Sequence, residues 1–461
     1  MQQFGYIKMF LISILFLVLV LLLPILIISN LEYFKFGITL FLGWIIVFYS
    51  GLKISILCYK NEKRLLELTF LVFVYVFMGL SAFTQAIYNS FPWRGYYSLS
   101  TINYGLIIVS IGILFYELGI YTGERKFTIK SIEDRKKNVF DYKSIKIFIL
   151  LSLLLSILIV FINGGIGNLF LTRLEKATIL GESEKSSYLL LNSLQKVPIF
   201  VCLLIVINIT IKKPIKANIG LLIFLIFINM LISNPISNAR YWFGTVILSI
   251  FMAILKWKKY SFFLWASGLL IMLLAIFPYA DIFRYSTSDL KITVIPFHEQ
   301  LIDNGDYDAF QQLLNTLEYV KDNGIVYGNQ LIGSFLFWVP RSFWTDKPYG
   351  TGQTVAEHLN YSFTNFSSPL WAESYINFGL LGVMVLFYLY GYFTTFAQKK
   401  YIYDSKKKND SIYLIIVPFL SGYQLFLLRG DLLNGVAYMS AFILFSVLFA
   451  KVKKFKKDVR D

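Results

Sequence analysis

Charged residues are scarce in this chain of 461 residues: 15% are Asp, Glu, Lys or Arg, whereas 57% are hydrophobic. A soluble chain carries roughly 25% charged residues, because it needs them to cover its surface. The scarcity of charge therefore excludes a soluble enzyme, and the apolar excess excludes a disordered chain. A mean hydropathy of +0.64 is typical of a protein that lies in a membrane.

Cysteine is almost absent, which excludes a scaffold built on disulfides. The two cysteines, Cys58 and Cys202, both lie within apolar runs. We expect them to be buried free thiols rather than a disulfide or part of a metal site.

Long apolar runs dominate what the sequence does contain. Twelve of them approach the length of about 20 residues that a helix needs to cross a bilayer. They cover residues 8–29, 36–58, 66–88, 99–121, 146–164, 195–211, 217–234, 241–255, 261–280, 373–397, 411–428 and 432–450. The sequence thus predicts an all-α polytopic membrane protein with about 12 transmembrane helices. We expect residues 1–461 to form a single integral membrane domain.

The net charge of +16 is distributed in short blocks between the apolar runs, not over one face, which argues against a nucleic-acid partner. Lysine and arginine gather in alternate connections, a pattern that marks the cytoplasmic side of a membrane. These connections are residues 60–64, 125–146, 212–216, 256–259, 399–408 and the tail from 451. We therefore expect both termini in the cytoplasm and residues 281–372 as one large extracytoplasmic loop.

This large loop contains two apolar segments. Residues 306–322 carry apolar side chains at helical spacing, and Asn323-Gly324 supplies a stop signal, so we expect an amphipathic helix. Residues 331–339 are too few to span a bilayer and are expected to lie on or dip into the outer interface. The Asp306-Tyr-Asp308 motif has the D-x-D form of metal-dependent sugar transferases, but we interpret it as acidic residues in the first helical turn.

Arginines, rather than lysines, stand beside aromatic residues at five positions near the expected outer helix ends. They are Arg94, Arg240, Arg284, Arg341 and Arg429. Taken singly, each is typical of an interfacial anchor. Taken together they indicate an anion site, because the planar guanidinium binds phosphate oxygens in pairs. We predict that Arg240, Arg284, Arg341 and Arg429, with Lys347, bind a lipid-linked diphosphate without a metal or cofactor.

The stretch Val-Pro-Arg-Ser-Phe-Trp-Thr-Asp-Lys-Pro-Tyr-Gly (339–350) resembles a segment of the Wzy-type oligosaccharide repeat-unit polymerases. The stretch Glu-Ser-Tyr-Ile-Asn-Phe-Gly-Leu-Leu-Gly (373–382) is similar to the start of the helix after the large outer loop in that family. The resemblance implies a GT-C-like glycosyltransferase of the bacterial cytoplasmic (inner) membrane that polymerises O-antigen or capsule. The loop 281–372 would cap its site.

The resemblance also implies the reaction and the partners. The growing glycan would leave its polyprenyl diphosphate and join a sugar hydroxyl of a lipid-linked repeat unit. Partners would be the polyprenyl-diphosphate-linked oligosaccharide, membrane lipids, and a chain-length regulator and flippase of the same pathway.

Such a transfer needs a general base within reach of the acceptor hydroxyl. Candidates on the expected outer side are Glu357, His358, Glu373 and Asp431, and we favour Glu373 or His358. A lone loop histidine is also typical of a surface residue, and an acid in a first helical turn can simply complement the helix dipole.

Three other functions stay open. A ligase would pass the finished polymer to another acceptor from the same diphosphate site. A flippase or exporter would show internal repeats, helices interrupted in matching positions and a charged cavity, and we find none of these in the sequence. A non-catalytic scaffold would not require the outer arginines.

Overall fold

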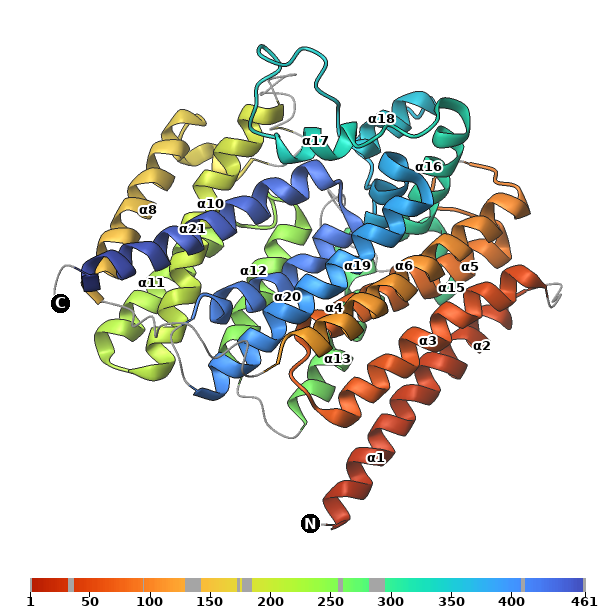
Figure 1. Ribbon diagram of the computed structural model, residues 1–461, viewed down its shortest axis with the longest axis horizontal. Helices are drawn as coiled ribbons and strands as arrows, with labels where there is room; N and C mark the ends of the chain where they lie inside the picture. The colour runs from red at the N-terminus through yellow and green to blue at the C-terminus, as the bar shows by residue number, and fades with distance from the viewer. Residues whose placement is uncertain are drawn as a thin grey trace.

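The computed structural model describes residues 2–31, 37–93, 95–128, 142–171, 175, 185–255, 260–281, 295–407 and 411–458. In these residues the chain forms helices and no strand. The helices run alongside one another as a bundle, with α1 at its edge and the two termini well separated (Figure 1).

Nine helical segments among the described residues are long and apolar enough to cross a membrane. They are built from α1 (Gln2–Leu17) with η1 (Val18–Leu22) and α2 (Leu23–Ile28), α3 (Ile38–Lys60), α4 (Leu65–Phe73) with η2 (Val74–Leu80) and α5 (Ser81–Tyr88), α6 (Leu99–Lys126), α8 (Tyr142–Ile162), α10 (Lys185–Lys212), α13 (Ser261–Ile271) with η4 (Met272–Ile276) and η5 (Phe277–Asp281), α19 (Leu370–Lys407), and α21 (Leu432–Asp458). Three further expected runs form shorter apolar helices, α11 (Lys216–Ile232), α12 (Arg240–Ile254) and α20 (Tyr413–Arg429). A polytopic all-α membrane protein is confirmed, and the count of twelve spans stays a prediction.

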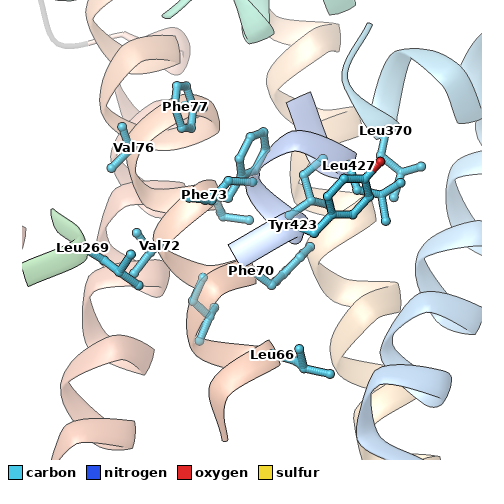
Figure 2. Packing of buried hydrophobic residues seen from close by; sticks show 14 of the residues in the cluster. Leu66, Phe70, Val72, Phe73, Val76, Phe77, Leu269, Leu370, Tyr423 and Leu427 are labelled. Atoms are coloured by element: carbon cyan, nitrogen blue, oxygen red, sulfur yellow. The ribbon is translucent and has the colours of Figure 1, made fainter. Parts of the chain in front are cut away.

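The segment Leu65–Tyr88 lies at the centre of the bundle, since its apolar window is entirely buried. A helix that is apolar on all sides can be surrounded by protein or by lipid, and here protein surrounds it. Phe70 lies beside Tyr423 of α20 (Figure 2). Phe70 and Phe73 both stack on Trp371 of α19, with ring centroids 6.2 and 6.3 Å apart. Within a bilayer such contacts stabilise the fold through close packing rather than through removal from water.

Glycines bring α6 and α19 into close contact. Gly112 and Gly119, seven residues apart on α6, lie against the Trp371 indole and the Tyr388 carbonyl, and Gly391 of α19 lies against the Tyr116 carbonyl. A Cβ atom at any of these positions would collide with its neighbour. Small residues at such spacing allow two membrane helices to approach closely.

The ion pairs among the described residues lie toward the two ends of the bundle. At one end Lys53 pairs with Glu117 at 2.8 Å, and Glu124 of α6 pairs with Arg64 at 3.2 Å and with Lys399 at 2.7 Å. These ion pairs join α3, α6, α19 and the α3–α4 connection at this end of the bundle.

The opposite end carries four short helices between α13 and α19, which we call the capping helices: α15 (Phe297–Asp303), α16 (Ala309–Asn323), α17 (Asn329–Phe335) and α18 (Thr351–His358). Three of them, α16, α17 and α18, lie together at the upper side of Figure 1. The expected amphipathic helix is confirmed as α16, which ends at Gly324 with φ +77°. Its polar residues Gln311, Gln312 and Asn315 are buried as well, so α16 is part of the core rather than a surface helix.

The helix α19 is interrupted near its start. Phe378 and Gly379 have non-helical backbone angles, and Gly379 has φ +60°. The segment before α17 occupies the break, because the Val326 amide donates to the Ile376 carbonyl at 2.9 Å and the Gly328 amide to the Asn377 carbonyl at 3.3 Å. This interruption was not expected from the sequence.

Candidate functional site: two arginines on an acidic turn

Arg240 and Arg429 lie on neighbouring helices at the capping end. Arg240 is the first residue of α12, and Arg429 is the last residue of α20. The two helices pack closely, since a Cβ at Gly422 would lie 3.1 Å from both the Leu248 side chain and the Thr245 carbonyl oxygen. The packing of α12 against α20 therefore places two arginines from distant parts of the sequence side by side.

Both guanidinium groups bind the same short turn, η6 (Gly305–Tyr307). Arg429 also binds Asp308, the residue that follows this turn. Arg240 contacts the Asp306 carboxylate at 3.2 and 3.3 Å. Arg429 donates to the Gly305 carbonyl at 2.8 Å, to the Asp306 carbonyl at 2.9 Å and to Asp308 Oδ1 at 2.9 Å. Two positive charges therefore face two negative charges at one place.

Asp308 is enclosed by donors. Besides Arg429, Ser367 Oγ donates to it at 2.9 Å, Trp93 Nε1 at 2.9 Å and Gln312 Nε2 at 3.2 Å. Its side chain is only 2% exposed. Trp93 also covers Gly305, where a Cβ would lie 2.5 Å from the indole ring.

These contacts correct our interpretation of the Asp306-Tyr-Asp308 motif. Neither aspartate complements the first turn of α16: the first turn of that helix holds no acid, and its N-cap Asp308 makes no side-chain capping bond. Both carboxylates bind arginines instead. The D-x-D motif is thus a functional candidate that the sequence displayed and that we set aside.

The tyrosine of this turn is held as a neutral donor. Burial raises the pKa of Tyr307, and the nearby Asp306 carboxylate raises it further. The protonated hydroxyl donates to the Leu273 carbonyl at 2.7 Å. This bond ties the acidic turn to the helical segment that contains η4.

A second polar group contains Glu373 and Asp431. Glu373 Oε2 accepts from the Thr351 hydroxyl at 2.7 Å, and its Oε1 accepts from the Leu432 amide at 2.9 Å. Asp431 Oδ2 accepts from the Gly352 amide at 3.2 Å, and its Oδ1 from the Leu433 amide at 2.9 Å.

Three helix N-termini meet at these two carboxylates, those of α18, α19 and α21. Amide groups at helix N-termini donate hydrogen bonds to these carboxyl oxygens, although the two side chains are only 1% and 7% exposed. A Cβ at Gly350 would collide with the Asp431 carboxylate, so the Gly350–Gly352 turn fits closely between them. The structure brings Glu373 and Asp431 together, and it encloses both.

Arg341 and Lys347 lie in the loop after α17 and bind its backbone. Arg341 donates to the carbonyls of Lys347 and Pro348, and its guanidinium carbon lies 3.9 Å from the centre of the Tyr349 ring. Lys347 Nζ donates to the carbonyls of Phe337 and Val339, each at 2.8 Å. Neither residue is joined to the Arg240–Arg429 pair by these contacts.

His358 is at the opposite end of α18 from Thr351. Its Nε2 lies 3.1 Å from Asp322 Oδ2, and its side chain is 31% exposed. Arg284 and Arg94 lie outside the described residues.

Sequence reasoning missed the donors around Asp308. Ser367 and Gln312 belong to no sequence motif, and Trp93 is distinguished in the sequence only as an aromatic neighbour of Arg94. Their roles depend on contacts between segments more than 200 residues apart for Trp93 and 59 apart for Ser367. Such pairings leave no local signal in a single sequence.

Comparison with known proteins gives no support for a family. No protein-family model matches the chain, no curated protein matches it, and no solved structure matches it. These comparisons therefore assign the chain to no family.

Chemically, the arginine pair can bind a doubly charged anion if the acidic turn moves aside. Of the two ion pairs, Arg240–Asp306 is the longer, and Arg240 is more exposed than Arg429, at 22% against 12%. Arg240 is therefore the guanidinium that an incoming anion reaches with less rearrangement.

Proposed function

We propose that the protein is a membrane glycosyltransferase that polymerises lipid-linked oligosaccharide repeat units of a bacterial surface polysaccharide. It would lie in the cytoplasmic membrane with twelve spans, both termini in the cytoplasm and residues 281–372 as an extracytoplasmic loop over the site. The observation that supports the proposal most is the convergence of Arg240 and Arg429, from two helices, on one anionic turn.

In the proposed reaction Arg240 binds the diphosphate of the glycan donor, and the positive charge of the neighbouring Arg429 stabilises it. Its phosphate oxygens replace the Asp306 carboxylate on Arg240, while Arg429 stays anchored by Asp308 and two carbonyls. As the glycosidic bond forms, negative charge grows on the leaving diphosphate, and fixed guanidinium groups stabilise it.

The acceptor hydroxyl also needs a base. Glu373 and Asp431 are enclosed, and backbone amides and the Thr351 hydroxyl hold their oxygens. Of the two favoured candidates, Glu373 and His358, we therefore propose His358 as the base, since its ring is partly exposed and pairs with Asp322.

The test uses purified protein with a defined lipid-diphosphate oligosaccharide. A polymerase yields a ladder of products at whole multiples of the repeat unit. Transfer to a different acceptor would indicate the ligase, and unaltered substrate would contradict both.

Two variants sharpen the test. We expect Arg240→Gln to abolish the ladder. We expect Lys213→Gln to leave it unchanged, because Lys213 is an exposed residue that directly follows the last residue of α10. An equally severe loss in both variants would show that the assay reports folding rather than diphosphate binding.

One observation favours an exporter of lipid-linked sugars as a second candidate. No interrupted helix was predicted from the sequence, whereas α19 is interrupted at Phe378–Gly379, a few residues after buried Glu373. Broken helices near membrane ion sites are typical of transporters, where they occur in matched pairs. Movement of intact lipid-linked sugar across proteoliposomes, without a ladder, would favour this candidate over the polymerase.

A further inference from the structure

The segment from α17 to Tyr349 has one buried face and one exposed apolar face. Gly333, Ser334 and Phe337 are buried. The exposed large apolar side chains are Ile332, Phe335, Leu336, Trp338 and Phe343, at 52%, 60%, 36%, 55% and 86%. Soluble surfaces rarely expose so many large apolar side chains within one short segment, and such faces mark interaction sites.

The loop that follows α17 is braced from within. Lys347 Nζ binds the carbonyls of Phe337 and Val339, and Arg341 binds those of Lys347 and Pro348. Pro348 also covers Gly333, where a Cβ would lie 2.5 Å from the proline ring. These four carbonyls therefore need no water, which suits a loop that lies in an apolar medium.

The exposed face also continues a lipid-facing stripe of α19. That stripe begins at Phe378, at the break in α19, and continues at helical spacing through Leu381, Val385 and Leu389; these side chains are 42%, 66%, 47% and 38% exposed. Its first member reaches the start of α17, since a Cβ at Gly328 would lie 2.8 Å from the Phe378 ring. The apolar face of α17 thus begins where the apolar stripe of a membrane-spanning helix ends.

We infer that residues 332–343 insert into the lipid leaflet at the capping end, with Phe343 at the tip, and that Arg341 and Lys347 brace this inserted loop. The partner is the acyl-chain region of the bilayer just below the headgroups, where short amphipathic helices rich in aromatic residues lie. This inference does not depend on the proposed enzymatic function.

Site-directed spin labelling tests the insertion on the full-length chain. Both native cysteines are buried, so the unmodified protein should take up little label and single cysteines can be labelled selectively. Phe343→Cys and Phe335→Cys report on the apolar face, and Lys321→Cys, whose native side chain is 75% exposed near the end of α16, is the matched control. Each variant is reconstituted in liposomes of phosphatidylcholine and phosphatidylglycerol.

Collisions with oxygen, which concentrates in acyl chains, are compared with collisions with a water-soluble nickel chelate. We expect the labels at 343 and 335 to favour oxygen by at least threefold over the label at 321. Equal nickel access at all three positions would overturn the inference. Strong spin–spin broadening at 343 would also overturn it, because a second copy of the chain would then cover this face.

Discussion

At the scale of single residues, a buried arginine is stable only where anions and carbonyls surround its guanidinium. Arg429 meets this condition through the carbonyls of Gly305 and Asp306 and the carboxylate of Asp308. Removing one partner of such a pair leaves an uncompensated buried charge, which costs more than the pair itself contributes. The turn and the arginine therefore stabilise each other.

Replacing Arg429 by Ala should lower the free energy of unfolding by about 3–5 kcal/mol, because Asp308 would lose its cation. The double variant Arg429→Ala with Asp308→Asn should recover part of this loss. Thermal unfolding of the purified variants in detergent measures both effects. Additive losses in the double variant would show that the two side chains do not interact.

Arg341 should behave differently from Arg429, since it is only half-buried and binds carbonyls instead of a carboxylate. We expect Arg341→Ala to cost about 1–1.5 kcal/mol, the contribution of ordinary hydrogen bonds. It should also increase protease cleavage between residues 337 and 348, because the loop loses its brace. Unchanged cleavage beside a wild-type control would contradict the bracing role.

At the scale of elements, the sequence predicted those features that depend only on residues close together in the chain. Apolar runs predicted the helices, Asn323-Gly324 predicted the end of α16, and the apolar setting of Cys58 and Cys202 predicted buried free thiols, all of which are confirmed. The break in α19 was missed because it depends on the distant Val326–Gly328 segment binding the freed carbonyls.

The candidate site was predictable only in part, for the same reason. Aromatic neighbours and helix-end positions singled out Arg240 and Arg429, and the structure places them together. The same signals singled out Arg341, which binds its own loop. A local pattern cannot tell an arginine that faces another helix from one that folds back on its own segment.

The close contact of α6 with α19 gives a prediction at this scale. Gly119→Val should destabilise the protein by about 1–3 kcal/mol, since the added side chain would displace the Tyr388 backbone. Gly268→Ala in α13 is the matched control, because nothing lies within 4 Å of a Cβ there. Comparable melting temperatures for the two variants would contradict the packing described here.

At the scale of the whole molecule, polar contacts separate to the two ends of an apolar bundle. The 28 residues of α6 link both: Thr101 near its start binds Glu318 of α16 at 3.0 Å, and Glu124 near its end pairs with Lys399 at 2.7 Å. At about 1.5 Å per residue, this helix is long enough to cross a bilayer.

We expect these two ends to face opposite sides of the membrane. A cysteine at Lys321, near the capping end, should react with an impermeant maleimide in intact cells. A cysteine at Glu62, between α3 and α4, should react only after permeabilisation. Labelling of both positions from the same side would contradict the orientation proposed from the charge distribution.

The central claim is that Arg240, supported by the charge of Arg429, binds a diphosphate in competition with the Asp306 carboxylate. Its most direct test is equilibrium binding of a short-chain prenyl-diphosphate oligosaccharide to the wild type, Arg240→Gln and Asp306→Asn, with the prenyl-monophosphate analogue as reference. We predict that Arg240→Gln loses at least tenfold in affinity for the diphosphate, whereas Asp306→Asn, which frees Arg240, binds it as tightly as the wild type or more tightly. Equal affinities in all three proteins, or no preference for diphosphate over monophosphate, would contradict the claim.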